Sequence, residues 1–172
     1  MVAVKVRKLT LMGLLTAIAL TIFMIEAGIP ALVPIPGIKL GLANIVTVFS
    51  VFVLGPGEAA SILFCRIFLG AAFAGNFSTI LYSGAGGLCA ILATIGLRKL
   101  LTMQQLWVAG ALGAVAHSFG QMAAAIAVTS TPSLAMYLPV MILCSLITGV
   151  FTGLCAQFLS NRGNKIWKTF LK

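Results

Sequence analysis

The sequence has very few acidic side chains. It contains no aspartate, and its glutamates are Glu26 and Glu58. A magnesium-diphosphate site of the prenyl-synthase type needs several clustered carboxylates, so this chain alone cannot assemble one. The chain also lacks a phosphate-binding loop of the form G-x-x-x-x-G-K-[ST], so it cannot power transport with an ATPase of its own. We therefore expect a protein that is not an enzyme.

Histidine is equally scarce, with His117 as the only one in the chain. The cysteines all fall inside apolar segments without a close-spaced pair, at Cys65, Cys89, Cys144 and Cys155. This spacing indicates neither a zinc site nor a disulfide framework. A hydrolytic dyad of Ser83 with His117 is disfavoured, because "LYSG" lacks the first glycine of the G-x-S-G element. We expect no catalytic residue, no metal site and no cofactor.

Charged residues make up only 8% of the chain, whereas 61% of its 172 residues are hydrophobic. Together with a mean hydropathy of +1.18, this composition is typical of an integral membrane protein. The net charge of +9 comes from 11 lysines and arginines, most of which lie in short segments between or beyond apolar runs. That pattern follows the positive-inside rule. The basic charge therefore indicates membrane topology rather than nucleic-acid binding, and we expect a multi-pass protein of a bacterial-type cell membrane.

The apolar runs predict an all-α membrane protein, a bundle of six transmembrane helices with both termini cytoplasmic. We place these helices near residues 9–29, 40–54, 58–74, 78–97, 105–128 and 135–159. In this arrangement all but two of the 11 cations lie on the inner side, which leaves Lys39 and Arg66 to explain. Residues 1–160 then form a single transmembrane domain, and residues 161–172 form a basic tail that we expect to lie along the inner leaflet.

The stretch "PIPGIKLGLANIVTVFS", residues 34–50, combines loop-forming residues with an apolar helix. The apolar run that it opens, residues 40–54, is short for a bilayer core of about 30 Å. Irregular backbone at membrane depth is tolerated only where protein buries it or where it lines a cavity. We therefore expect residues 30–38 to fold inward as a capping first outer loop, with Lys39 at the point where this loop joins the helix.

Polar residues in and around the predicted helices form a candidate binding site. Arg66 falls near mid-bilayer, where a charge is costly, so it either binds an anion or is satisfied internally by Glu26 or by helix carbonyls. His117 and Gln121 share one helix face at a spacing of four residues, and they form either a binding wall or an interhelical contact. The residues that we expect to bind substrate are Lys39, Asn44, Arg66, Asn76, Tyr82, His117 and Gln121. Two cations in apolar surroundings predict a small amphipathic anion as the substrate.

Small residues recur at intervals of four on the first predicted helix, at Gly13, Ala17 and Thr21. A second ridge of small residues lies on the sixth predicted helix, at Ser145, Gly149 and Gly153. Ridges of this kind let two helices approach closely. We expect the second ridge to pack within the bundle, whereas the first is either bundle packing or a docking surface for a partner.

Three stretches together resemble a known family: "PIPGIKLGLANIVTVF" from Pro34, "RIFLGAAFAGNFSTILYSGAGG" from Arg66 and "GAVAHSFGQ" from Gly113. The family that they resemble is the Gx transporter family, whose members are often labelled heptaprenyl diphosphate synthase component I. That family is similar to the substrate-binding S components of energy-coupling factor (ECF) transporters. The resemblance implies six helices, cytoplasmic termini, a first loop that caps the substrate, and a small-x-x-x-small motif that contacts a transmembrane coupling subunit. The matching positions of that motif here are Gly13 and Ala17.

Two functions from different classes remain open at this point. The first, which the resemblance implies, is an S component of an ECF-type importer that works with a coupling subunit and two ABC ATPases. It would capture an isoprenoid or quinone precursor, or a vitamin-like molecule. The second is a non-catalytic membrane subunit that supports a polyprenyl diphosphate synthase. Co-purification separates the two, because the first predicts a coupling subunit with two ATPases and the second predicts a soluble prenyl synthase.

Overall fold

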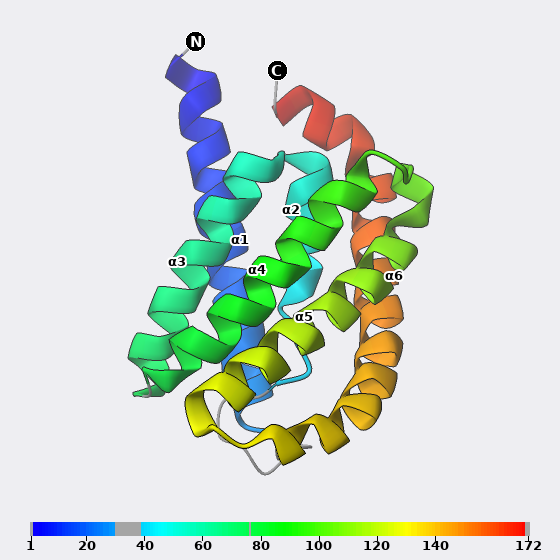
Figure 1. Ribbon diagram of the computed structural model, residues 1–172. Coiled ribbons are helices and arrows are strands. Elements are labelled where there is room, and N and C mark those ends of the chain that lie inside the picture. Colours follow the sequence, from blue (N-terminus) through cyan, green and yellow to red (C-terminus); the bar gives the residue numbers. More distant parts are fainter. Residues whose placement is uncertain (1, 30–38, 76, 171–172) are drawn as a thin grey trace.

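The computed structural model describes residues 2–29, 39–75 and 77–170, and within them the side chains of residues 6–163. The α-helices are α1 (Val2–Ala27), α2 (Asn44–Val53), α3 (Pro56–Ala74), α4 (Ser78–Arg98), α5 (Leu106–Thr129) and α6 (Leu138–Phe170) (Figure 1). Two short 3-10 helices, η1 (Met103–Gln105) and η2 (Pro132–Tyr137), precede α5 and α6. No strand occurs among the described residues. The prediction of an all-helical bundle is confirmed.

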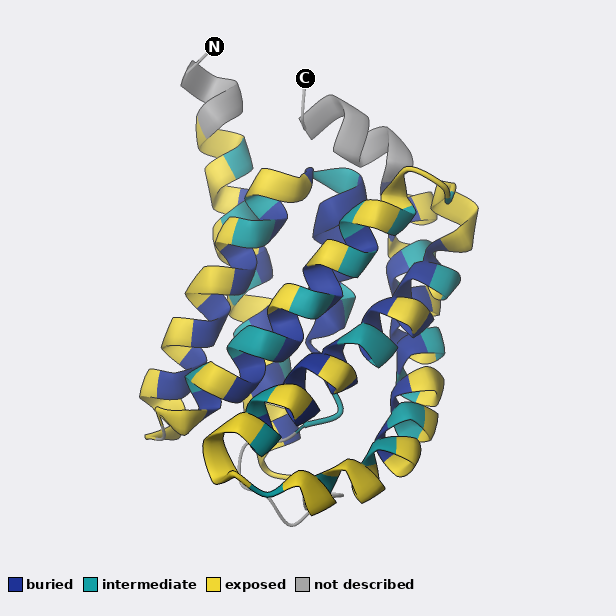
Figure 2. Ribbon diagram, in the orientation of Figure 1, coloured by how far each residue is buried: buried dark blue, intermediate teal, exposed yellow. Residues whose placement is uncertain are grey.

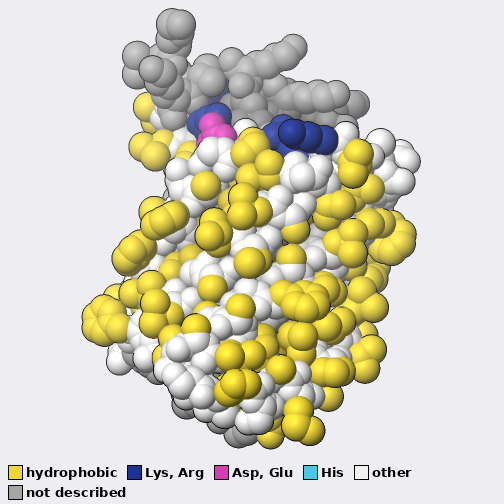
Figure 3. Space-filling model, in the orientation of Figure 1, with side chains coloured by type: hydrophobic (Ala, Val, Ile, Leu, Met, Phe, Trp, Pro, Cys, Tyr) yellow, Lys and Arg dark blue, Asp and Glu magenta, His cyan; other side chains and the backbone are white. Residues whose placement is uncertain are grey.

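Within the described part of the chain, five helices are long and apolar enough to cross a membrane, namely α1, α3, α4, α5 and α6. Many residues of these helices are exposed (Figure 2), and apolar side chains cover much of the face shown in Figure 3. An exposed apolar surface of this extent is what a lipid environment requires. The chain is therefore a multi-pass membrane protein.

The second helix is shorter than predicted and lies inside the bundle. It has 10 residues and so rises about 15 Å, roughly half of a bilayer core. It begins four residues later than predicted because residues 41–43 form a turn, which Gly41 enters with a φ of 81°. Eight of its residues are buried, and α2 contacts each of the other five α-helices. The proposed cap, residues 30–38, lies outside the described residues.

Both ends of the chain lie at the same end of the bundle (Figure 1). That both termini are cytoplasmic stays a prediction. The terminal helices are longer than predicted, since α1 begins at Val2 and α6 continues to Phe170. Lysine and arginine are good helix formers and no proline interrupts either end, so the basic segments extend the helices. The expected tail, residues 161–172, is thus helical as far as the structure describes it.

Small residues bring α5 and α6 into close contact. A Cβ on Gly110 of α5 would lie 2.4 Å from the carbonyl oxygen of Gly149 and 2.6 Å from the Cα of Gly153. The hydroxyls of Ser118 and Ser145 form a hydrogen bond across the same interface. The prediction that the ridge on the sixth helix packs within the bundle is confirmed.

Candidate functional site

A group of polar side chains gathers inside the bundle, between its middle and the end opposite the termini. We call it the polar cluster, and its members are Glu26, Lys39, Asn44, Arg66, His117 and Gln121. They come from α1, from the turn before α2, and from α2, α3 and α5. All are buried except Lys39, which is half-buried. A charged or polar side chain buried in a membrane protein is costly, which makes this cluster the first candidate for function.

Glu26 anchors the turn that leads into α2. Its Oε1 atom accepts a hydrogen bond of 2.6 Å from the backbone N–H of Gly41. The same turn closes with the N–H of Asn44 donating to the carbonyl of Gly41 at 2.9 Å. The end of α1 is thereby joined to the start of α2, so the carboxylate fixes where Lys39 and Asn44 lie.

The ring of Phe23 lies next to both cations of the polar cluster. Lys39 Nζ is 3.3 Å from the ring centroid, and the Cζ atom of Arg66 is 5.8 Å from it. Both distances are within the range of a cation–π interaction. Gly70 on α3 leaves room for the ring, because a Cβ there would lie 2.8 Å from Phe23 Cε1. Phe23 thus holds two positive charges at one place without neutralising either.

Two glycines flank the imidazole of His117. A Cβ on Gly86 of α4 would lie 2.9 Å from His117 Cε1 and 2.7 Å from Gln121 Cγ. A Cβ on Gly41 would lie 3.2 Å from His117 Cδ2 and 2.9 Å from Asn44 Nδ2. Gln121 also reaches the turn, since its Oε1 accepts a long hydrogen bond of 3.4 Å from the backbone N–H of Lys39. The wall predicted from His117 and Gln121 therefore faces the turn before α2 and the glycine face of α4.

Several polar atoms of this cluster have no hydrogen-bond partner among the described residues. They include both amide atoms of Asn44, the Nε and Nη2 of Arg66, and the Nε2 of Gln121. The three side chains are 3%, 4% and 0% exposed, so bulk water does not satisfy them. Each such atom costs about 1–3 kcal/mol if it stays unpaired. This unused hydrogen-bonding capacity is what a ligand site provides.

Arg66 is expected either to bind an anion or to form an ion pair with Glu26. Arg66 lies close enough to Glu26 and His117 to interact with both electrostatically. However, among the described residues Glu26 and Arg66 form no salt bridge within 4.0 Å, whereas Lys8 and Glu58 do form one. The Glu26 carboxylate is instead used by the backbone of the turn. Arg66 is therefore not half of a close ion pair with Glu26, and two of its nitrogens stay without a hydrogen-bond partner among the described residues.

The model of the family described as heptaprenyl diphosphate synthase component I matches residues 15–159, most of the chain. The chain belongs to this family. No match is found among curated proteins or among solved structures.

The family match includes the polar cluster and both of the sequence motifs that contribute Arg66 and His117. Of the residues predicted to bind substrate, the structure brings together Lys39, Asn44, Arg66, His117 and Gln121. It places Tyr82 in a separate apolar cluster with Met122, Ala125 and Met141. Asn76 lies outside the described residues. The grouping of five of these side chains required the fold, because they come from four separate parts of the chain.

The sequence does not assign four residues that contribute to this site: Phe23, Glu26, Gly41 and Gly86. For Glu26 it indicates only a possible pairing with Arg66. Phe23 shares a face of α1 with Glu26 at a spacing of three residues, and that spacing was the only available signal for it. Gly41 and Gly86 carry no side chain that could mark them, although both fall within the motifs that indicated the family.

The first small-residue ridge lies on the outer surface of α1. Gly13, Ala17 and Thr21 are all exposed, and no heavy atom lies within 4 Å of a Cβ built on Gly13. The neighbouring side chains Leu14 and Ile18 are also exposed. Among the described residues this ridge does not pack against another helix, in contrast to the ridge on α6.

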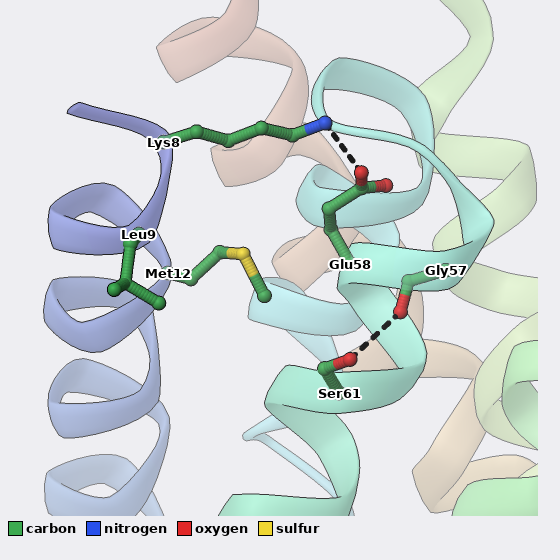
Figure 4. A pocket seen from close by; sticks show the side chains of 6 residues that line it. All are labelled: Lys8, Leu9, Met12, Gly57, Glu58 and Ser61. Carbon is green, nitrogen blue, oxygen red and sulfur yellow. Dashed lines mark hydrogen bonds and ion pairs between the residues drawn. The ribbon is translucent and has the colours of Figure 1, made fainter. Parts of the chain in front are cut away.

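A hollow lies between α1 and α3, near the end of the bundle that carries the termini. It is lined by Lys8, Leu9, Met12, Gly57, Glu58 and Ser61 (Figure 4). Lys8 and Glu58 form an ion pair there, and the Ser61 hydroxyl donates to the Gly57 carbonyl at 3.1 Å. Because these polar groups satisfy one another, this hollow is a weaker candidate for a ligand site than the polar cluster.

Proposed function

We propose that the protein is the substrate-binding S component of an ECF-type importer, and that it captures a small amphipathic anion. The observation that carries this proposal is the buried Arg66, with two unpartnered nitrogens, beside Lys39 and Phe23. Two cations in a water-poor site bind an anion strongly, because charge-assisted hydrogen bonds are stronger there than their neutral counterparts. The surrounding apolar helices suit a hydrocarbon or aromatic body. The resemblance of the sequence motifs to a transporter family that is similar to S components supports transport rather than catalysis.

The position of the polar cluster also fits capture followed by delivery. It lies toward the end of the bundle away from the termini, and its member Lys39 directly follows in sequence the segment that we expect to act as a cap. If the termini are cytoplasmic, the anion enters from the outer side. The protein would then need a partner that supplies ATP-driven work, and the exposed ridge of Gly13, Ala17 and Thr21 is the surface that we assign to a transmembrane coupling subunit working with two ABC ATPases.

Replacing Ala17 by tryptophan tests this docking surface. The bulky ring prevents close helix approach, so Ala17→Trp should abolish co-purification with the coupling subunit and its ATPases. Binding of small anions by the isolated protein should remain, since Ala17 is exposed and lies outside the polar cluster.

Leu88→Trp on α4 is the matched control, because Leu88 is also an exposed apolar residue of a long helix. This variant should keep both assembly and anion binding. If both tryptophan variants assemble normally, the ridge on α1 is not the docking surface.

The charge of Lys39 should make anion binding depend on pH. Partial burial lowers the pKa of the Lys39 ammonium from 10.5 to about 8, an effect that Glu26 opposes and Arg66 reinforces. Below this pKa the ammonium is charged and attracts the anion, whereas above it the free protein must take up a proton to bind. We expect affinity for a small carboxylate or phosphate to fall about tenfold from pH 7 to pH 9. Calorimetry at both pH values measures this.

Lys39→Arg provides the control for this pH effect. Arginine keeps its charge throughout the range, so the variant should lose the decrease in affinity between pH 7 and pH 9. A decrease of the same size in Lys39→Arg would assign the titration to another group.

The second candidate function is a non-catalytic membrane subunit that supports a polyprenyl diphosphate synthase. The name of the matching family, heptaprenyl diphosphate synthase component I, is the observation that favours it. Affinity purification from native membranes separates the two proposals. A coupling subunit with two ABC ATPases among the captured proteins supports the importer, and a soluble prenyl synthase in their place supports the alternative.

A further inference from the structure

The two unpartnered nitrogens of Arg66 lie on the same edge of its guanidinium group. In arginine, Nε–H and one Nη2–H point in parallel to one side of the planar group. Both atoms are buried, and neither has a hydrogen-bond partner among the described residues. The side chain as a whole is only 4% exposed. The free part of Arg66 is therefore a complete donor edge rather than two unrelated atoms.

Such an edge matches the two oxygens of a carboxylate. Arginine binds carboxylates through two parallel N–H···O bonds, and this bidentate geometry adds specificity to the charge attraction. A lysine in the same place would supply charge without the planar fork. The geometry thus describes the shape of the anion's head group as well as its sign.

The number of charges in the cluster limits the charge of the ligand. Counted at their formal charges, Lys39 and Arg66 contribute two positive charges and Glu26 contributes one negative charge, which gives a net charge of +1 with His117 neutral. One negative charge neutralises this site. A diphosphate brings at least one more negative charge, and an unpaired charge in a buried site is strongly unfavourable.

Asn44 adds a second recognition element. Its amide nitrogen and its amide oxygen are both without a partner among the described residues, and the side chain lies beside the imidazole of His117, across Gly41. A ligand group that both donates and accepts a hydrogen bond, such as an amide, would satisfy both atoms.

We propose that the polar cluster selects a monocarboxylate, held side-on by the Nε and Nη2 of Arg66, and rejects diphosphates. A carboxylate that also carries an amide satisfies Asn44 in addition. This inference rests on the proposed function, because it specifies the substrate class of the same site. It also predicts that prenyl diphosphates do not bind at this site, because their head group carries more negative charge than the cluster can neutralise.

The test uses pairs of ligands with the same body and different head groups. The first pair of probes is benzoate and phenyl phosphate. The second pair is 4-methylpent-4-enoate, the carboxylate of the isopentenyl chain, and isopentenyl diphosphate. Hippurate is added as a carboxylate that carries an amide. Thermal-shift and calorimetric binding are measured on the purified full chain in nanodiscs. We expect the carboxylate of each pair to bind at least tenfold more tightly than its phosphate counterpart, and hippurate to bind more tightly than benzoate.

The possible outcomes distinguish this inference from the proposed function. Tighter binding of the phosphates or diphosphates overturns the monocarboxylate assignment but leaves an anion-binding S component. If neither the carboxylates nor the phosphates bind, the monocarboxylate assignment and the proposed function are both wrong. The binding measurements on the unmodified protein decide the head group even if an Arg66 variant fails to fold.

Arg66→Lys tests the side-on geometry separately. If the fork is required, Arg66→Lys should lose carboxylate affinity by at least tenfold, as Arg66→Met does, while the thermal unfolding temperature without ligand shows whether the variant folds. Retention of affinity by a folded Arg66→Lys would mean that charge alone is recognised, and the bidentate assignment would be wrong.

Discussion

Arg66→Met is expected to weaken carboxylate binding by roughly tenfold to a hundredfold, because a hydrogen bond to a charged group contributes about 1.5–3 kcal/mol. Methionine keeps the length and the apolar character of the side chain but removes the charge and the donors. Lys39→Met should also weaken binding, by about tenfold or more if the ammonium contributes more than about 1.4 kcal/mol. Calorimetry with benzoate on folded protein measures both effects.

Arg98→Met is the matched control for this experiment. Arg98 ends α4 at the end of the bundle that carries the termini, far from the polar cluster along its helix. Its removal should leave affinity unchanged. Unchanged affinity in both Arg66→Met and Lys39→Met would show that these charges serve helix packing or membrane orientation, which contradicts the binding site proposed here.

Gly86→Ala is expected to have the second large effect. Its added Cβ would lie 2.7 Å from Gln121 Cγ and 2.9 Å from His117 Cε1, closer than carbon atoms tolerate. Overpacking of this kind costs about 1–3 kcal/mol, so the unfolding temperature should fall. The displaced imidazole and amide should also reduce carboxylate affinity by more than tenfold, as measured by calorimetry at a temperature where the variant remains folded.

Gly84→Ala, two residues away on the same helix, is the control. No heavy atom lies within 4 Å of a Cβ at Gly84, and alanine favours a helix by about 0.8–1.0 kcal/mol over glycine. This variant should therefore be at least as stable as the unmodified protein and should bind normally. Equal binding by the two alanine variants would show that the space beside His117 is not needed for the ligand.

The sequence predicted the membrane class and most helices because their signals are local. Apolar runs set the number of long helices, and prolines and glycines mark their ends, as at Pro56 and Gly75. The start of α2 was less predictable. Apolar residues continue from Leu40 onward, and only the left-handed backbone of Gly41 together with its bond to Glu26 places the turn before Asn44.

The candidate site was predictable where polarity and spacing combine. His117 and Gln121 are recognisable because two polar side chains recur on one helix face, and Arg66 because a cation interrupts an apolar helix. Phe23 was not recognisable, since it is one of 11 phenylalanines and its role depends on two cations from other parts of the chain. Gly86 was not recognisable either, because the reason for its small size is the position of another helix.

The arrangement of Glu26 shows why geometry was needed to interpret Arg66. From the sequence alone, Glu26 and Arg66 are expected to form an ion pair, because a buried charge in a membrane helix usually needs a partner. The fold instead directs the carboxylate to a backbone N–H of the turn before α2, and the donor edge of Arg66 remains free. Which of the two arrangements forms depends on where the turn at residues 41–43 places the N–H of Gly41, and no local sequence signal specifies that position.

The most direct test of the account is mass spectrometry of the small molecules released from the protein after gentle purification from native membranes, compared with the same analysis of Arg66→Met. We predict that one small anion is released from the unmodified protein in near-stoichiometric amount and that it is lost from a folded Arg66→Met. Release of lipids alone from both proteins, or of the same anion in equal amounts from both, would contradict the claim that Arg66 binds a substrate.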